Sequence, residues 1–283
     1  MYGPGDVRVE DRPDPEITAP TDAIIRLAAT CVCGSDLWSW RGIEPVTHPT
    51  PMGHEYVGII EEVGSQVRAL RPGQLVVGSF MASDNTCPIC QAGYQSRCAH
   101  VELVGAGGAQ AELLRIPLAD GTLVVAARQL GADRIIVMSR REPRQKLARE
   151  FGATDIVSDR GDEGVAVVRE LTGGLGAHSV IEAVGTQESM MQAIRSTRAG
   201  GHVGYVGVAH GVTLPGDELF YAEVHLLGGP APVRRFLPRL IELIEAGTIR
   251  PGKVFDLELP LAEAAEGYRA MDERRAIKSL LRP

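Results

Sequence analysis

Short apolar runs separated by turn residues dominate the chain up to about residue 118. Glycine- and proline-containing segments such as Arg71–Gly73 lie between these runs. Runs of this length with such boundaries are typical of strands rather than helices. This part of the chain is therefore predicted to be mostly strand, over the segments Ala23–Leu27, Tyr56–Val63, Leu75–Val77 and Glu112–Ile116.

After Leu123 the pattern changes to helices that alternate with short β-branched runs. One helix is predicted to begin at Pro143, a residue that suits a first helical position, and to end before Gly152. Strands that alternate with helices pair in parallel, which gives a doubly wound α/β fold of the nucleotide-binding kind. Further helices are predicted over residues 163–172 and 188–197, and strands over residues 135–138, 155–158, 179–181 and 202–206.

The last part of the chain returns to strand character. A helix is predicted over residues 234–246, a strand over 254–259, a helix over 262–271 and a final strand over 277–281. A tail of this kind fits a chain that re-enters its first domain. We therefore expect residues 1–123 to form a mainly-β domain, residues 124–246 a nucleotide-binding domain, and residues 247–283 to return to the first.

Composition and charge narrow the class of protein. The 283 residues are 44% hydrophobic and contain no low-complexity run, as expected for a globular protein of one or two domains. A net charge of -7 without blocks of like charge argues against nucleic acid or a membrane surface as a partner. We expect a cytoplasmic protein, because the first residues lack signal-peptide features and no apolar run reaches membrane length.

Three of the five cysteines form the most specific local pattern, Asp84-x2-Cys87-x2-Cys90-x7-Cys98. Closely spaced thiolates in a loop suit a tetrahedral structural zinc ion, which needs four ligands. Asp84 stands where a fourth ligand would complete the spacing, and a carboxylate is an acceptable donor. A surface role for Asp84 is an equally good interpretation. Three buried free thiols are the less favoured interpretation of the cysteines.

A second set of candidate ligands comprises Cys33, His54 and Glu55. A catalytic zinc ion takes three protein ligands and keeps one position open, and these are suitable donor types. Adjacent strand residues point to opposite faces, so His54 and Glu55 reach one ion only if Gly53 places them in a turn. Glu55 is either a ligand or a neighbouring, exchanging carboxylate. Cys31 is expected to be a core residue.

Several motifs together make the chain similar to the zinc-containing medium-chain dehydrogenase/reductase family. The resemblance implies a chaperonin-10-like catalytic domain, a Rossmann domain and a zinc ion at which the substrate oxygen binds. The motifs occur in the family's order and spacing, and with the C-terminal half they cover nearly the whole chain. They are Cys33–Asp36, Gly53–Gly58, Arg71–Val76 and the cysteine lobe.

The resemblance also implies roles for individual residues. Cys33 and His54 match the catalytic zinc ligands, Glu55 the nearby carboxylate, and Ser35 the hydroxyl that relays the alcohol proton. Cys87, Cys90 and Cys98 match three structural zinc ligands, but Asp84 stands where the family usually has cysteine.

The cofactor domain lacks its expected phosphate-binding turn. A dinucleotide site should open with a strand, a G-x-G-x-x-G turn and a helix, and no such triplet precedes Val124. Gly105–Gln110 lacks the last glycine and is interpreted as a hairpin turn. Val124–Ala132 is similar to the later turns of the missing helix. Several tens of residues are thus absent between Leu123 and Val124, and the resemblance places a further zinc ligand and the interdomain hinge among them.

A true deletion there would remove the central strand of the sheet and leave apolar edges unpaired. The simpler hypothesis is that the molecule contains residues at this point that the sequence omits.

The end of the second predicted strand of the cofactor domain bears on cofactor choice. Ser139 and Arg140, with Arg144 one helical turn later, suit the 2′-phosphate of NADP better than the ribose of NAD. The alternatives are that the arginines are a solvated helix start, or that Glu142 mimics the acidic residue of an NAD site. The resemblance places four further residues in cofactor loops: Val184, Gly185, Val206 and Gly207. An equally good interpretation is that the glycines there serve only as turn residues.

The expected function is reversible hydride transfer between NADP(H) and an alcohol/aldehyde or ketone pair, with catalytic and structural zinc. The alternatives are a polyol or amino-alcohol dehydrogenase on the same scaffold, or a non-catalytic zinc-binding protein if the deletion is real. The resemblance favours a homo-oligomer, dimer or tetramer, associating near His225–Gly229. Trp38 and Trp40 either narrow the substrate pocket or serve packing.

Overall fold

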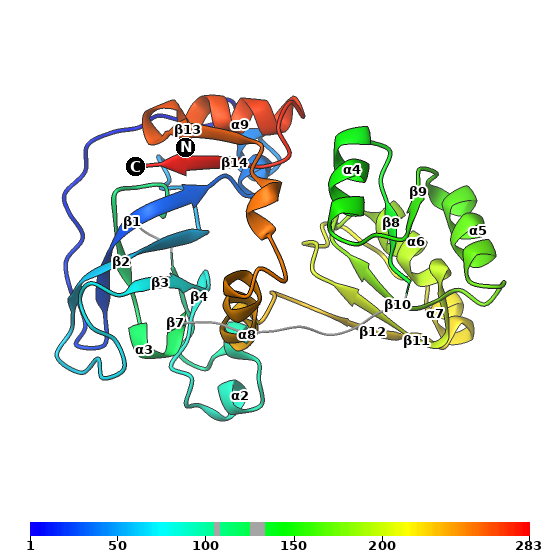
Figure 1. Cartoon of the computed structure of the whole chain (residues 1–283), viewed down its shortest axis with the longest axis horizontal. Coiled ribbons are helices and arrows are strands. Elements are labelled where there is room, and N and C mark those ends of the chain that lie inside the picture. Colours follow the sequence, from blue (N-terminus) through cyan, green and yellow to red (C-terminus); the bar gives the residue numbers. More distant parts are fainter. Residues whose placement is uncertain (105–107, 125–133) are drawn as a thin grey trace. The chain divides into compact units, whose positions relative to one another are not determined.

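The computed structural model of the protein (Figure 1) describes residues 1–104, 108–124 and 134–283. The chain divides into two units, one comprising Met1–Gln129 with Pro232–Pro283 and the other Leu130–Ala231. The first unit is mainly β and the second contains parallel sheets, in agreement with the expected fold class. The sequence placed residues 232–246 in the cofactor domain, whereas they group here with the first unit.

A seven-stranded sheet forms the centre of the first unit. The long strands β1 (Ala23–Cys31) and β2 (Tyr56–Val63) pair antiparallel, and β6 (Leu113–Ile116) pairs with β1 as well. The other strands are β3 (Leu75–Gly78), β7 (Leu123–Val124), β13 (Leu257–Pro260) and β14 (Ser279–Arg282). β14 pairs with β1, so the last strand of the chain lies in the sheet of the first unit.

The core of this unit follows from alternation along the two long strands. Ile25 of β1, Ile60 of β2 and Ile116 of β6 are almost completely buried and belong to one apolar cluster. Buried β-branched side chains on paired strands stabilise such a sheet.

Short helices and a small hairpin complete the first unit. The helix α9 contacts β13 and β14, while α8 contacts β3 and β7. The hairpin comprises β4 (Met81–Ala82) and β5 (Glu102–Leu103). The helices are α1 (Asp36–Trp40), α2 (Pro88–Gln91), α3 (Ala119–Thr122), α8 (Val233–Glu245) and α9 (Ala264–Asp272), with 3-10 turns η1 (Gln95–Arg97), η2 (Pro251–Val254) and η3 (Leu261–Glu263).

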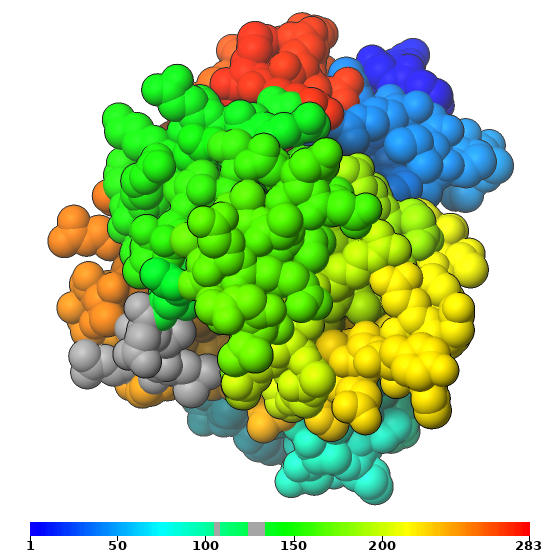
Figure 2. All heavy atoms as spheres, turned by 90° about the vertical axis from the view of Figure 1, so that its right-hand side faces the viewer, coloured from blue at the N-terminus to red at the C-terminus, as the bar shows by residue number. Residues whose placement is uncertain are grey.

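Strands and helices alternate throughout the second unit, as the sequence predicts. Pro143 lies in the first turn of α4 and Gly152, at φ +98°, follows its end. In chain order the elements are β8 (Ile136–Met138), α4 (Glu142–Glu150), β9 (Asp155–Val157), α5 (Gly161–Leu171), β10 (Ala177–Glu182), α6 (Gln187–Ser196), β11 (Thr197–Tyr205), α7 (Gly216–Ala222) and β12 (His225–Gly228). Residues of α4 and α5, in green, cover much of the face of this unit seen in Figure 2.

The strands of the second unit form two separate parallel sheets instead of one. β8 pairs with β9, and β10 pairs with β11, which pairs with β12. Among the described strands no ladder joins β8 to β10. On β10 and β12, Ile181 is 77% and Leu227 70% exposed. This division of the sheet is what the lack of a central strand between β8 and β10 predicts.

Some predictions at the level of single elements are wrong. Val124 was assigned to a helix, but it lies in β7 and pairs with Val77, because the strand edge of β3 is available to it. Residues 251–254 form a 3-10 turn, so the strand predicted over 254–259 begins only at Leu257. The rest of the predicted helix, 125–132, and part of the turn at 105–110 lie outside the described residues. Within the described ranges, every helix is too short or too polar to cross a bilayer.

Candidate active site and metal centres

The sheet of the first unit brings Cys33, His54 and Glu55 together. Cys33 lies just after β1, and His54 and Glu55 directly precede β2, the antiparallel neighbour of β1. One ligand atom from each of the three side chains lies within 4.8 Å of those of the other two. A cysteine, a histidine and a carboxylate in this arrangement suit a catalytic zinc ion.

The turn required of Gly53 is present. Its φ is +92°, and a Cβ built there would lie 2.7 Å from the Gln110 backbone nitrogen. The Gly53 carbonyl accepts a hydrogen bond from the Ala109 N–H, at 3.0 Å. Glycine is therefore needed both for the backbone angle and for the close approach. Because His54 and Glu55 lie in this turn and not in a strand, both side chains reach Cys33.

Asp36 organises the residues around Cys33 and His54. Its buried carboxylate accepts a hydrogen bond from the Cys33 N–H at 2.8 Å and lies 3.4 Å from His54 Nδ1. Ser35 Oγ lies 3.3 Å from the other ring nitrogen, Nε2. Hydrogen bonds with Asp36 and Cys33 raise the pKa of His54 to about 10. A metal ion bound by this ring would have to displace its proton.

Glu55 is held from two sides. The Cys31 thiol donates to Glu55 Oε2 at 2.7 Å, and the Lys278 ammonium donates to Oε1 at 3.1 Å. Burial disfavours the charged carboxylate, but the charge of Lys278 and the hydrogen bonds from Cys31, Lys278 and Cys33 together outweigh it and lower the pKa of Glu55. Burial also raises the pKa of Cys31, which agrees with the expectation of a core residue.

Packing explains Trp40 better than a pocket does. Trp40 is 9% exposed, and its ring centroid lies 5.5 Å from that of Tyr268, on α9. The Tyr268 hydroxyl donates to Gln110 Oε1 at 3.1 Å, and Gln110 Nε2 in turn lies 3.4 Å from Asp36. The C-terminal segment thus supports the candidate active site through Gln110.

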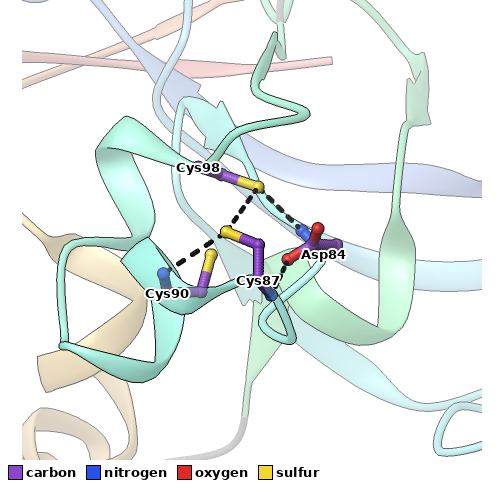
Figure 3. Close-up of side chains that lie close together, drawn as sticks. All are labelled: Asp84, Cys87, Cys90 and Cys98. Atoms are coloured by element: carbon purple, nitrogen blue, oxygen red, sulfur yellow. Dashed lines mark hydrogen bonds between the residues drawn. The ribbon is translucent and has the colours of Figure 1, made fainter.

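The second candidate metal centre lies in the loop after β4 (Figure 3). Cys87 caps α2, Cys90 lies within α2, and Cys98 follows η1. All three thiols are buried and none forms a disulfide. The carboxylate of Asp84 completes the group, since ligand atoms of all four residues lie within 4.8 Å of one another.

The geometry of these thiols fits a zinc ion. Cys87 Sγ and Cys98 Sγ are 3.9 Å apart. A tetrahedral site with Zn–S bonds of about 2.3 Å has sulfurs roughly 3.8 Å apart. Backbone N–H groups of Ala99 and Cys90 point at the Cys87 sulfur and lower the pKa of Cys87 to about 7. Donors aimed at sulfur favour the thiolate, which is the form that binds zinc.

Sequence reasoning missed His100 and Lys278. His100 Nδ1 lies 2.6 Å from Asp84 Oδ2 in the cysteine lobe. Lys278 lies next to Glu55, 223 residues away in the chain. Neither residue belongs to a motif, although His100 follows Cys98 by only two positions and its proximity could have suggested it.

Two candidate cofactor loops meet at the C-terminal ends of β10 and β11. Buried Glu182 ends β10, and its Oε1 accepts hydrogen bonds from the N–H groups of Val184 and Gly185 at 2.7 and 2.9 Å. A Cβ on Gly207 would lie 2.5 Å from the Gly185 nitrogen, so the loops touch through their backbones. Val184 and Val206 are exposed at this edge, where ligands bind in doubly wound folds.

The residues considered for NADP lie at the end of β8 and the start of α4. Gln145 Nε2 donates to the Ser139 carbonyl at 2.6 Å, which fixes the turn between the two elements. Ser139 is half-buried, whereas Arg140 and Arg144 are exposed. Their side chains are therefore accessible to a phosphate group.

Comparison with known proteins identifies the class to which this fold and these sites belong. Residues 19–126 match the alcohol dehydrogenase GroES-like domain, and residues 121–246 match the zinc-binding dehydrogenase domain. A protein from Mycobacterium tuberculosis described as a probable zinc-binding alcohol dehydrogenase is 32% identical over 99% of this chain and 87% of its own length. The chain belongs to the zinc-dependent medium-chain dehydrogenase family, a family of oxidoreductases that use zinc and a nicotinamide cofactor.

Solved structures agree with this assignment. The alcohol dehydrogenase from Thermus sp. ATN1 is 28% identical, with a TM-score of 0.88, and the match covers 100% of this chain and 98% of the other. A protein from Sinorhizobium meliloti described as a putative zinc-binding dehydrogenase, solved with NADP bound, is 25% identical, with a TM-score of 0.78 and coverage of 99% of this chain and 96% of the other.

The alignment with the Mycobacterium tuberculosis protein also bears on the gap at Leu123. It extends over 338 positions, whereas this chain has 283 residues, so at least 55 aligned positions are occupied only in the relative. The relative therefore has at least 55 residues within the aligned region that this sequence lacks.

Proposed function

We propose that the protein catalyses reversible hydride transfer between NADP(H) and an alcohol/aldehyde or ketone pair. The observation that carries this proposal is the grouping of Cys33, His54 and Glu55 within 4.8 Å in a chain of the zinc-dependent dehydrogenase family. In the proposed division, residues 1–123 and 247–283 form the catalytic domain and residues 124–246 the cofactor domain.

Each residue of the candidate active site has a proposed part in this reaction. Cys33 and His54 would hold a zinc ion, which would supply Lewis-acid chemistry to the substrate oxygen when bound. Asp36 orients the His54 ring through Nδ1, 3.4 Å away. Ser35 Oγ, which is exposed, takes the proton of the alcohol and passes it toward solvent. Glu55, held by Lys278, stands beside the metal as third ligand or exchanging carboxylate.

NADP is the proposed cofactor. Two exposed arginines and a serine hydroxyl follow β8, where the adenosine ribose binds in this fold, and they suit the charge and hydrogen-bonding capacity of a 2′-phosphate. The NADP bound to the Sinorhizobium meliloti relative supports this choice. The proposed cofactor residues are Ser139, Arg140, Arg144, Val184, Gly185, Val206 and Gly207.

The second metal centre and the oligomer are proposed on similar grounds. Asp84, Cys87, Cys90 and Cys98 are the proposed ligands of a structural zinc ion, because the sulfur spacing and the N–H donors suit it. A homo-oligomer, dimer or tetramer, would associate through the edge strand β12, which pairs only with β11 among the described strands.

The Cys33→Ala variant tests the proposed reaction. This variant should bind one zinc ion fewer per chain and should show no turnover. It should still bind NADPH, as measured by fluorescence titration. Undiminished turnover of this variant would remove the zinc mechanism. A screen of simple alcohols, aldehydes, polyols and amino alcohols for activity that a chelator removes then separates the preferred substrate class from the alternatives.

A wild-type protein that binds zinc but neither NADPH nor NADH would instead support the non-catalytic alternative, since a chain truly lacking the pyrophosphate turn should bind the cofactor poorly.

A further inference from the structure

His100 forms a hydrogen bond with Asp84, the only member of the proposed ligand set of the cysteine lobe that is not a cysteine. Its Nδ1 lies 2.6 Å from Asp84 Oδ2, a distance typical of a strong, charge-assisted hydrogen bond. The side chain of Asp84 is 15% exposed, whereas that of His100 is 69% exposed. The imidazole therefore lies on the solvent side of the Asp84 carboxylate.

Both oxygens of the Asp84 carboxylate have defined partners. Oδ1 accepts hydrogen bonds from the backbone N–H groups of Thr86, at 2.8 Å, and Cys87, at 3.0 Å. These two bonds use both lone pairs of Oδ1. Oδ2 accepts from His100 and keeps one further lone pair. The two backbone N–H groups and the imidazole thus hold the carboxylate at both oxygens, and His100 fixes its rotation about the terminal bond.

A carboxylate needs such support more than a thiolate does. A cysteine offers a single donor atom, whereas a carboxylate offers two oxygens and turns about its terminal bond. Partners beyond the direct ligands orient them and strengthen metal binding. We propose that His100 is a positioning residue that fixes Asp84 as the fourth ligand of the zinc ion of the cysteine lobe. This inference rests on the proposed structural zinc site.

The reverse arrangement, with His100 as the ligand and Asp84 behind it, fits the geometry less well. Among the described residues, the group whose ligand atoms lie within 4.8 Å of one another contains Asp84 and not His100. The backbone N–H groups of Asp84 and His100 both donate to the Cys98 sulfur, at 3.4 and 3.3 Å, so that contact does not separate the two arrangements, and the grouping of ligand atoms decides between them.

A double-mutant cycle of Asp84 and His100 tests the proposal. All variants carry Cys33→Ala, so that the zinc remaining on the chain reports on the lobe. The rate of zinc release to a colorimetric chelator is measured at fixed pH. His100→Ala should accelerate release by about 10- to 100-fold, the usual effect of losing such a partner. Asp84→Cys should retain zinc, and adding His100→Ala to Asp84→Cys should change its release rate less than twofold.

Two further variants keep the test decisive. His100→Asn retains a hydrogen-bond donor and should recover most of the loss, whereas His48→Ala removes another exposed histidine of the same unit and should have no effect. Equal release rates for His100→Ala and His48→Ala would overturn the role of His100. So would an equal acceleration in the Asp84→Cys background, because His100 would then act without Asp84. If the Cys33→Ala parent holds no zinc at all, the proposal of a structural zinc site is itself wrong.

Discussion

Lys278 Nζ lies 2.8 Å from Glu55 Oε2, and together these residues link the last strand of the chain to the candidate active site. Burial disfavours the charged ammonium, but the attraction of Glu55, Cys31 and Cys33 together outweighs this effect and raises the pKa of Lys278. The Lys278→Met variant leaves the carboxylate without its partner. Breaking a buried pair costs about 3–5 kcal/mol, and because Glu55 is 36% exposed we expect a loss of about 1–3 kcal/mol in the free energy of unfolding. Urea denaturation measures it.

Arg282→Met is the matched control for this prediction. Arg282 lies four residues later, at the end of β14, and pairs with Glu258 at 2.9 Å with both side chains at least half exposed. Exposed pairs of this kind contribute little. Equal destabilisation by the two variants would contradict a special role for Lys278.

Ser35→Ala should slow turnover without loss of stability or zinc. Ser35 precedes α1, but its side chain makes no capping hydrogen bond, so the helix does not depend on it. Removal of a positioned proton-transfer group typically lowers the rate by about 10²–10⁴-fold. Steady-state kcat and zinc content are measured for Ser35→Ala and for Ser35→Thr, which keeps the hydroxyl. A Ser35→Ala enzyme as fast as the Thr variant would exclude the proton relay.

Much of the fold could be predicted because its signals are local. Tyr56–Val63 is a short, largely apolar run that ends at a turn signal, and it forms β2 with the predicted ends. Pro143 and Gly152 mark the ends of α4 in the same way. The candidate zinc ligands could be grouped because both signals are local in the sequence. One is the spacing of the motif residues, and the other is the preference of Gly53 for a positive φ.

Contacts between distant segments could not be predicted in this way. Nothing near Lys278 indicates that β14 pairs with β1 and delivers its ammonium to Glu55. Val124 continues an apolar stretch that suits a helix as well as a strand, and only the free edge of β3 decides for β7. His100 is one of several exposed histidines until the fold of the lobe places Asp84 beside it.

Asp22 should make the protein acid-sensitive. Its carboxylate is 1% exposed, lies 2.9 Å from Arg115, and accepts a hydrogen bond from the Ala19 N–H at 2.8 Å. Burial opposes ionisation, but the bonds with Arg115 and Ala19 outweigh it and lower the pKa of Asp22 below 3.8. The stabilisation is therefore complete above the unfolded-state pKa and is lost as the pH falls through the folded-state value.

Comparison with Asp22→Asn measures this contribution. At pH 7 the wild-type protein should be more stable than the variant by about 1–3 kcal/mol in urea denaturation. The difference should stay constant down to about pH 5 and shrink below that. If the difference in unfolding free energy between the wild-type protein and Asp22→Asn instead grew as the pH falls, the pKa of Asp22 would not be lowered by folding.

Ser139→Asp should shift the cofactor preference from NADPH toward NADH. A carboxylate at the end of β8 repels the 2′-phosphate and can bind a ribose hydroxyl. We expect the NADPH-to-NADH ratio of kcat/KM to fall at least about tenfold, equivalent to about 1.4 kcal/mol. Ser65→Asp adds the same charge to an exposed position of the first unit and should leave the ratio unchanged. An unaltered ratio in Ser139→Asp would count against the NADP proposal.

The divided sheet of the second unit indicates that residues are missing from the sequence, and their number predicts the mass of the intact molecule. β8 and β10 lack a common neighbour among the described strands, and the Mycobacterium tuberculosis relative has at least 55 aligned positions that this sequence lacks. At this chain's mean residue mass, from 30.3 kDa over 283 residues, 55 residues add about 6 kDa. Intact-mass spectrometry of the protein from its natural source should therefore give about 36 kDa or more, and a peptide map should contain no peptide joining Leu123 directly to Val124. A mass of 30.3 kDa with that junction peptide present would show that the deletion is real.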